Sequence, residues 1–280
     1  MPQLQLSQGT IHYTDTGSGP VVVLVHGLLV DGTLWAEPAS LLAKDFRVVV
    51  PDLPLGSHTE AMQPDADLSP AGLARLVADF LAALDLTGVT LVGNDTGGAV
   101  CQAVAARHPA RLARLVLTPC DAFDNFLPFP VKHLQLFGRS AAGLKVLAES
   151  LRFRWIQRLP IAFGLLTRRP IPADIMASYT GPLRVNRGTR RDFARLVRAI
   201  SVRYTQEAAT GLTDFDRPVL LAWAQQNFFP VDHAERLAKL LPIVQLRVID
   251  DSGPFVAEDQ PRHLTQLIDQ FLAQCASDSR

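Results

Sequence analysis

The chain has 280 residues, with 27 Lys+Arg and 27 Asp+Glu, so its formal net charge is zero. Its 48% hydrophobic and 19% charged residues exclude a disordered chain and suit one large domain, or a domain with an insertion. Balanced charge argues against nucleic acid as a partner. No apolar run reaches the roughly 20 residues that a membrane span needs, so we expect no membrane partner either.

The first ten residues, MPQLQLSQGT, lack the basic start and apolar core of a signal peptide. Cys101, Cys120 and Cys275 form no CxxC pair and no disulfide framework. We therefore expect a cytoplasmic protein with reduced thiols. Without an HExxH motif, a His/Cys cluster or a nucleotide loop, we expect neither a metal nor another cofactor.

Apolar strands alternate with helices through the first 120 residues. A hairpin is predicted at 3–17, followed by almost wholly apolar strands at 21–25, 47–50, 89–93 and 114–118. Ser69-Pro70 predicts the start of a helix that ends near 85, and another helix is predicted at about 96–108. This alternation predicts a right-handed, doubly wound α/β sheet.

The alternation stops between about 123 and 210, where helical periodicity, prolines and many arginines prevail. It resumes with strands at 218–223 and 245–250, and with helices at about 231–241 and 258–274. We therefore predict a core domain formed by residues 1–122 and 211–280. We place a helical cap at 123–210, over the carboxyl ends of the strands, where α/β proteins bind ligands.

The strongest local motif is Gly93-Asn94-Asp95-Thr96-Gly97-Gly98, which follows one predicted strand and opens a helix. A sharp strand-to-helix turn needs small flanking residues and holds its central residue in a strained conformation. Gly93 and Gly97 supply that room, so Asp95 is the residue expected at the apex. The Thr96 amide, at the helix N-terminus, then faces any oxyanion formed there.

Two further loops follow predicted strands, His26-Gly27 and PDLPLG at 51–56. With the turn at Asp95, they make the whole chain resemble the α/β-hydrolase fold. That resemblance implies an eight-stranded, mostly parallel sheet with a helical cap, and a second oxyanion amide from Leu28. An aspartate at the turn resembles the haloalkane dehalogenase and epoxide hydrolase branch, in which the aspartate attacks carbon and a histidine then activates water.

The chain departs from that branch at the histidine. The family has Gly-His-Phe after the last strand, whereas this chain has Gly253-Pro254-Phe255, and proline cannot act as a base. The family acid is also absent, because Asn227 ends the corresponding Ala224–Asn227 segment. Some dehalogenases take the acid from the end of the preceding strand, where this chain has Asp121 and Asp124. We name both as catalytic candidates beside Asp95.

Several aromatic and histidine residues are candidates for the substrate pocket. His26 and His58 are the two histidines that we expect near the site. Trp35 and Trp223 are expected near the mouth of the sheet. Tyr179 and Tyr204 lie in the cap, where epoxide hydrolases place tyrosines that protonate the epoxide oxygen. Asn227, Pro254 and Phe255 complete the candidate set because of their places in the two altered motifs.

Three functions stay open from the sequence. The first is a cofactor-independent hydrolase that uses Asp95 on a small-to-medium apolar organic substrate, with epoxide opening favoured over dehalogenation because Thr96 replaces the family's tryptophan. The second is acid–base chemistry, such as isomerisation, cyclisation or elimination, by a buried Asp95 with a raised pKa. The third is a ligand-binding homologue without activity. Either a monomer or a homodimer fits the sequence.

The zero net charge is the sum of a basic segment and an acidic remainder of the chain. Residues 121–210 hold 15 Lys+Arg against 6 Asp+Glu, and the rest of the chain holds 12 against 21. A basic cap over an acidic core favours closure and attraction of an anionic substrate.

Overall fold

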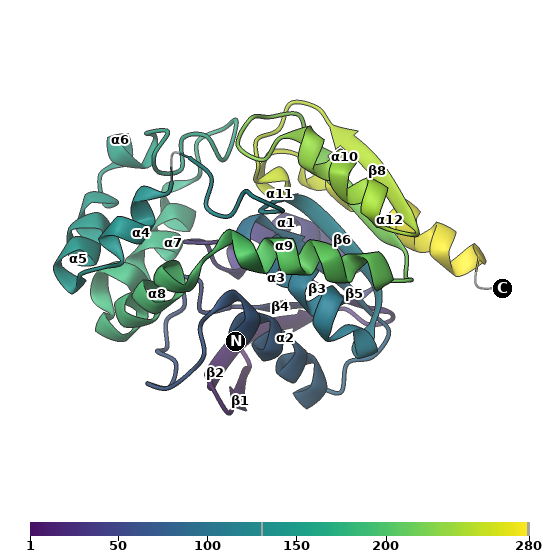
Figure 1. The fold of residues 1–280 in the computed structure, drawn as a ribbon, viewed down its shortest axis with the longest axis horizontal. Helices are drawn as coiled ribbons and strands as arrows, with labels where there is room; N and C mark the ends of the chain where they lie inside the picture. The colour runs from purple at the N-terminus through teal and green to yellow at the C-terminus, as the bar shows by residue number, and fades with distance from the viewer. Residues whose placement is uncertain (130, 279–280) are drawn as a thin grey trace.

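The computed structural model of the chain describes residues 1–129 and 131–278. Its centre is an eight-stranded sheet with the strand order β1-β2-β4-β3-β5-β6-β7-β8 (Figure 1). β1 pairs with β2 and β2 with β4 in antiparallel fashion, and the other neighbours are parallel. The predicted eight-stranded, mostly parallel sheet is therefore confirmed. The strands are β1 (Gln3–Leu6), β2 (Gly9–Thr16), β3 (Val21–Val25), β4 (Arg47–Pro51), β5 (Val89–Asn94), β6 (Leu112–Cys120), β7 (Val219–Ala224) and β8 (Val244–Ile249).

Helices cover both faces of the sheet, which explains why the central strands are apolar throughout. β5 and β7 are buried along their whole length. In one layer α1 packs against α12, and in the other α2, α3 and α9 pack side by side (Figure 1). The core helices are α1 (Ala36–Leu42), α2 (Pro70–Ala83), α3 (Asp95–Arg107), α9 (Val202–Gly211), α10 (Val231–Leu240), α11 (Val256–Asp259) and α12 (Pro261–Asp278).

The starts of α2 and α12 can be compared with the starts predicted from the sequence. Ser69 caps α2 through its hydroxyl, which accepts a bond from the Gly72 amide at 3.1 Å, and Pro70 follows at the first helical position, as predicted. The last helix was predicted to begin at Glu258, which is wrong. Glu258 belongs to the short α11, and α12 begins at Pro261. Proline has no amide hydrogen to donate and a fixed φ, so it suits a helix start.

Between β6 and α9, five helices form a separate group at one end of the sheet (Figure 1). α5 packs against α7 and α8 within this group. The predicted cap ends at residue 210 and therefore includes most of α9 (Val202–Gly211). In the structure, α9 packs along α3 of the core. No helix in the described ranges is long and apolar enough to cross a membrane. The five helices are α4 (His133–Phe137), α5 (Ala141–Ser150), α6 (Arg154–Gln157), α7 (Ala173–Val185) and α8 (Arg187–Ala199).

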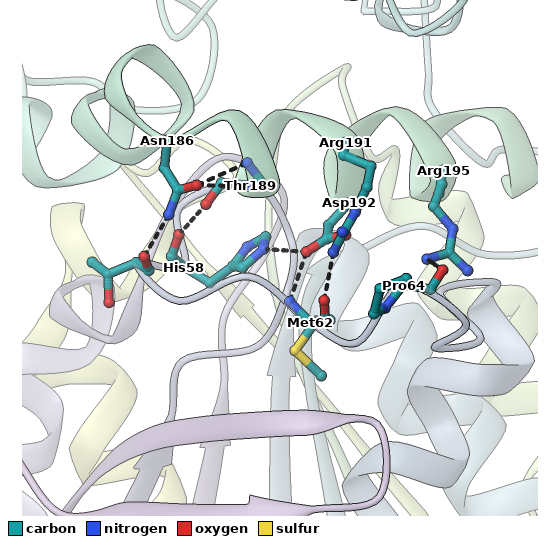
Figure 2. A network of polar contacts seen from close by, with 10 residues as sticks. His58, Met62, Pro64, Asn186, Thr189, Arg191, Asp192 and Arg195 are labelled. Carbon is teal, nitrogen blue, oxygen red and sulfur yellow. Dashed lines mark hydrogen bonds and ion pairs between the residues drawn. The ribbon is translucent and has the colours of Figure 1, made fainter.

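A network of polar contacts ties α8 to the loop that follows β4 (Figure 2). The Asn186 amide donates to the Thr59 carbonyl at 2.8 Å, and the Thr189 hydroxyl donates to the His58 carbonyl at 2.9 Å. Arg195 donates to the Pro64 carbonyl at 2.7 Å. These contacts give hydrogen-bond donors to backbone carbonyls of the loop and attach α8 to it.

Asp192 lies at the middle of this network and is wholly buried. Its carboxylate accepts a bond from the Met62 amide at 2.8 Å and one from Arg191 at 2.9 Å (Figure 2). The His58 ring lies 3.5 Å away. One carboxylate therefore holds two segments that are 130 residues apart in sequence.

Replacing Asp192 by alanine is expected to destabilise the fold by about 2–3 kcal/mol, because the buried Met62 amide loses its acceptor. Urea unfolding followed by circular dichroism measures the loss. Asp174→Ala, an exposed change on α7, is the matched control and should cost less than about 1 kcal/mol. Equal losses in the two variants would contradict a structural role for the network.

Candidate functional site

The chain turns sharply where β5 ends at Asn94 and α3 begins at Asp95. Asp95 has a φ of +54°, in the left-handed region that disfavours most side chains and that aspartate tolerates. Added Cβ atoms show why glycines surround it. A Cβ on Gly97 would lie 2.1 Å from the His26 carbonyl oxygen, and one on Gly93 would lie 2.7 Å from the Cys101 sulfur. The glycines that the sequence identified are therefore required by close packing.

The Asp95 carboxylate is held by the two amides that the sequence analysis named. The Leu28 amide donates to Asp95 Oδ2 at 2.9 Å, and the Thr96 amide also bonds to the carboxylate. Gly27 makes this approach possible, because a Cβ there would lie 2.3 Å from Oδ2. Burial raises the pKa of Asp95 to about 6, while the two amides act to lower it.

Asp95 lines a cavity of about 140 Å³ that lies beneath the cap. Leu28 and Leu29 line it from the core, and helices α4, α5 and α6 contribute from above. Apart from Asp95, the described lining residues are apolar except His133 and Ser150. A mostly apolar cavity with a single carboxylate suits an apolar organic ligand.

Asp121 lies next to the turn, as one of the two catalytic candidates at the end of β6. It is wholly buried, and its carboxylate accepts bonds from the Thr96 hydroxyl at 3.1 Å and from the Leu127 amide at 3.1 Å. Burial, reinforced by the charge of Asp95, raises the pKa of Asp121 well above its usual range. The two carboxylates are thus linked through Thr96, whose amide contacts Asp95 and whose hydroxyl contacts Asp121.

Asp124, the other candidate acid, lies at the surface. Its side chain is 72% exposed and pairs with Arg236 at 3.2 Å. The guanidinium of Arg236 also lies over the Phe123 ring, 4.0 Å from its centroid. The structure therefore separates the two aspartates, bringing Asp121 to the turn and leaving Asp124 in a surface ion pair.

The two histidines expected near the site support loops. His26 is buried, with Nδ1 2.9 Å from the Gly27 carbonyl and Nε2 accepting from the Leu53 amide at 2.9 Å. Burial lowers the pKa of His26. His58 is buried beside Asp192 in the network of Figure 2. Neither belongs to the described lining of the Asp95 cavity.

The aromatic candidates lie outside the described lining of the Asp95 cavity. Trp35 and Trp223 are wholly buried, and Trp223 donates to the Phe229 carbonyl at 2.8 Å. Tyr179 is wholly buried and donates to Glu258 at 3.0 Å. Tyr204 is half-buried on α9, under the guanidinium of Arg203. None of the four belongs to the described lining of the cavity.

Asn227 is exposed and lines a separate, more polar cavity of about 540 Å³ together with Gly253. Pro254 is buried, and its carbonyl accepts a bond from the Asn94 side chain at 2.8 Å. Phe255 is wholly buried, and its amide donates to the Leu166 carbonyl of the cap at 2.9 Å. The segment that would carry the family histidine thus joins the turn to the cap.

The sequence analysis missed His133, which lines the Asp95 cavity from α4. Its ring is half-buried and lies edge-on to Phe137, with the centroids 5.8 Å apart. His133 and Phe137 are four residues apart, and Leu134 and Phe137 are three apart. A helical period over this segment would have placed all three near one face. In the described part of the chain, no group of three His, Cys, Asp or Glu residues is placed to hold a metal.

Comparison with known proteins agrees with the fold. Residues 20–261 match the family model described as alpha/beta hydrolase fold. Haloalkane dehalogenase 2 of Mycobacterium tuberculosis is 28% identical, with 95% of this chain and 92% of that protein covered. A 2-hydroxy-6-oxo-2,4-heptadienoate hydrolase of Pseudomonas putida is 26% identical, over 92% of this chain and 91% of that protein.

A solved epoxide hydrolase superposes with a TM-score of 0.81 at 18% identity, covering 98% of each chain. At that identity the likeness concerns the fold. The family model spans most of the chain, and the relatives that align along its length are named as hydrolases and dehalogenases. The chain is therefore an enzyme of the α/β-hydrolase fold family, similar in sequence to a haloalkane dehalogenase and in fold to an epoxide hydrolase.

Proposed function

We propose that the enzyme hydrolyses small-to-medium apolar electrophiles through attack by Asp95 on carbon, with epoxides preferred to haloalkanes. The observation that carries the proposal is the setting of the Asp95 carboxylate. Its Oδ2 is held by the Leu28 amide at 2.9 Å, and the residue lines an apolar cavity. This leaves Oδ1 as the attacking atom.

In the proposed reaction, Asp95 Oδ1 bonds to an epoxide carbon while the ring carbon–oxygen bond breaks. The ring oxygen takes up a proton, which gives a hydroxyalkyl ester of Asp95. Water then adds to the ester carbonyl, and the Leu28 and Thr96 amides stabilise the oxyanion that forms. Collapse releases a diol, regenerates the carboxylate and returns the proton.

Polar groups in the cavity favour an epoxide over a haloalkane. A departing halide needs N–H donors directed at it, but Thr96 follows Asp95 and the indoles of Trp35 and Trp223 lie outside the described lining. An epoxide oxygen needs a proton. His133 and Ser150 are the polar groups near the substrate in this proposal, and they replace the tyrosines expected from the sequence. We assign proton donation to His133 because it lines the cavity and an imidazole ring can donate a hydrogen from nitrogen.

The second half of the reaction is expected to be slow. Pro254 occupies the place of the family histidine, and a carboxylic ester needs an activated water. Asp121 cannot replace that histidine directly in this arrangement, because the Thr96 hydroxyl and the Leu127 amide hold its two oxygens. We therefore propose an atypical catalytic triad, which lacks the usual histidine, so that the ester of Asp95 accumulates.

A second candidate function is acid–base catalysis by Asp95 without a covalent step. It is favoured by the pKa of about 6, which allows Asp95 to exchange a proton near neutral pH. Burial and the charge of Asp95 also raise the pKa of Asp121, which lies beside the turn. Such a site suits isomerisation or elimination on an apolar substrate. The absent histidine leaves ligand binding without turnover as the third reading.

Incubation with styrene oxide is expected to produce a covalent adduct on the peptide that contains Asp95. Intact-mass and peptide mass spectrometry should show a gain equal to the whole epoxide, whereas 1-bromohexane would add only its alkyl group. Asp95→Asn should remove the adduct, and Asp124→Asn, a surface control, should keep it.

Two outcomes would overturn this proposal. An isomerised product without any adduct would support acid–base catalysis. Ligand binding that survives in Asp95→Asn, without turnover in the wild-type enzyme, would support the binding function.

Pro254→His is expected to speed hydrolysis of the trapped ester by about 10–100-fold, because it restores a general base to the family position. The Asn94 contact is preserved, since it is made to the backbone carbonyl. Single-turnover decay of the adduct measures the rate. Pro254→Ala controls for loss of the proline ring. Equal decay rates for the histidine and alanine variants would show that the missing base does not limit turnover.

Asp95→Asn is expected to stabilise the fold above pH 6. The folded pKa of about 6 exceeds the ordinary 3.8, so the charged form is disfavoured in the folded state by roughly 3 kcal/mol at most. The gain should be largest at pH 8 and should vanish as the pH falls through 6 towards 4, where the wild-type carboxyl is protonated. Urea unfolding at both pH values measures it, with the exposed Asp216→Asn as control. A gain independent of pH would contradict the raised pKa.

A further inference from the structure

A third cavity, of about 250 Å³, lies in the cap and is lined by four arginine side chains, Arg154, Arg158, Arg168 and Arg169. All four residues are exposed. Within the described residues, none of these guanidinium groups takes part in an ion pair. We call this cavity, as defined by these arginines, the basic vestibule.

Asp259 contacts this segment, but its carboxylate binds backbone amides and not the guanidinium groups. The Asp259 carboxylate accepts bonds from the Arg168 amide at 2.9 and 3.0 Å, and from the Gly253 amide at 2.8 Å. These are backbone contacts that fix the cap to the loop before α11, and the guanidinium groups stay without an acidic partner. Like charges within one cavity repel, so an anion that enters relieves the repulsion.

The basic vestibule shares a wall with the cavity at Asp95. Phe163 lines both spaces. Its side chain is 5% exposed and stacks on Tyr179, with the centroids 6.4 Å apart and the rings 25° from parallel. Because Tyr179 is itself wholly buried and bonded to Glu258, the ring of Phe163 is supported from behind. A ligand that runs along Phe163 therefore has one end among arginines and the other near Asp95.

We propose that the basic vestibule binds the carboxylate of an amphiphilic substrate whose apolar chain enters the Asp95 cavity. A guanidinium group binds a carboxylate through two parallel hydrogen bonds, and several arginines on one wall suit that geometry. The apolar lining beyond Phe163 favours a hydrocarbon chain. The inference rests on the proposed function of Asp95 for its chemistry, but its binding step needs no reaction.

Isothermal titration of octanoate and octanamide tests the vestibule, because the two probes share a chain and differ in charge. The wild-type enzyme and Asp95→Asn should both bind octanoate at least about tenfold more tightly than octanamide. The preference should shrink as KCl rises from about 20 to 300 mM, since salt screens exposed charges. The double variant Arg158→Gln/Arg168→Gln should weaken octanoate binding about tenfold and change octanamide binding less than twofold.

The matched control is Arg187→Gln/Arg198→Gln, which removes the same charge from exposed positions on α8 outside the vestibule. It should keep the preference for octanoate. Equal affinity of both probes in the wild-type enzyme would overturn the proposal, and so would an equal loss in the control, because that would reflect overall charge. Inorganic phosphate or acetate binding as tightly as octanoate would also overturn it, since a free anion would then suffice.

Failure here is distinct from failure of the proposed function. A missing Asp95 adduct together with a retained octanoate preference would reject the nucleophile and keep the vestibule. An adduct from styrene oxide together with equal binding of octanoate and octanamide would keep the nucleophile and reject the vestibule.

Discussion

The left-handed backbone at Asp95 is the constraint on which the site depends. A φ of +54° persists only where the surrounding structure fixes it, and here three neighbouring elements do so. Gly27, in the loop after β3, leaves room for the carboxylate. Gly97 of α3 lies against the His26 carbonyl, and Cys120 at the end of β6 packs against Gly98. In this conformation one carboxylate oxygen accepts a bond from the Leu28 amide, and Asp95 lines an apolar cavity.

The loop before α11, where the family resemblance leads us to expect a histidine, has a structural role. Pro254 contributes its carbonyl to Asn94, directly before the turn, and the Phe255 amide bonds to Leu166 of the cap. A Cβ on Gly253 would lie 2.6 Å from that same Leu166 carbonyl. The segment therefore couples the turn to the cap wall, which gives a physical reason for its close packing that is independent of catalysis.

The sheet and the turn could be predicted because their signals are local. Period-2 and wholly apolar runs determine strands, and glycines beside Asp95 specify the backbone there. The choice between Asp121 and Asp124 could not be predicted, because only two residues separate them and tertiary packing decides which is buried. Tyr179 was expected near the substrate on chemical grounds, yet its hydroxyl reaches Glu258. His133 was missed because a cavity is formed by helices whose relative placement no local pattern encodes.

Two groups of arginines in the basic cap have different surroundings. On α8, Arg191 and Arg195 donate to loop carbonyls and so hold the cap to the core (Figure 2). Around residues 154–169, four arginines instead surround a cavity without acidic partners in the described chain. Arginines that satisfy carbonyls need no anion, whereas those of the vestibule are at lowest energy with one bound. Part of the positive charge of the cap therefore lies beside a wall of the Asp95 cavity, where the proposed anionic substrate would be recognised.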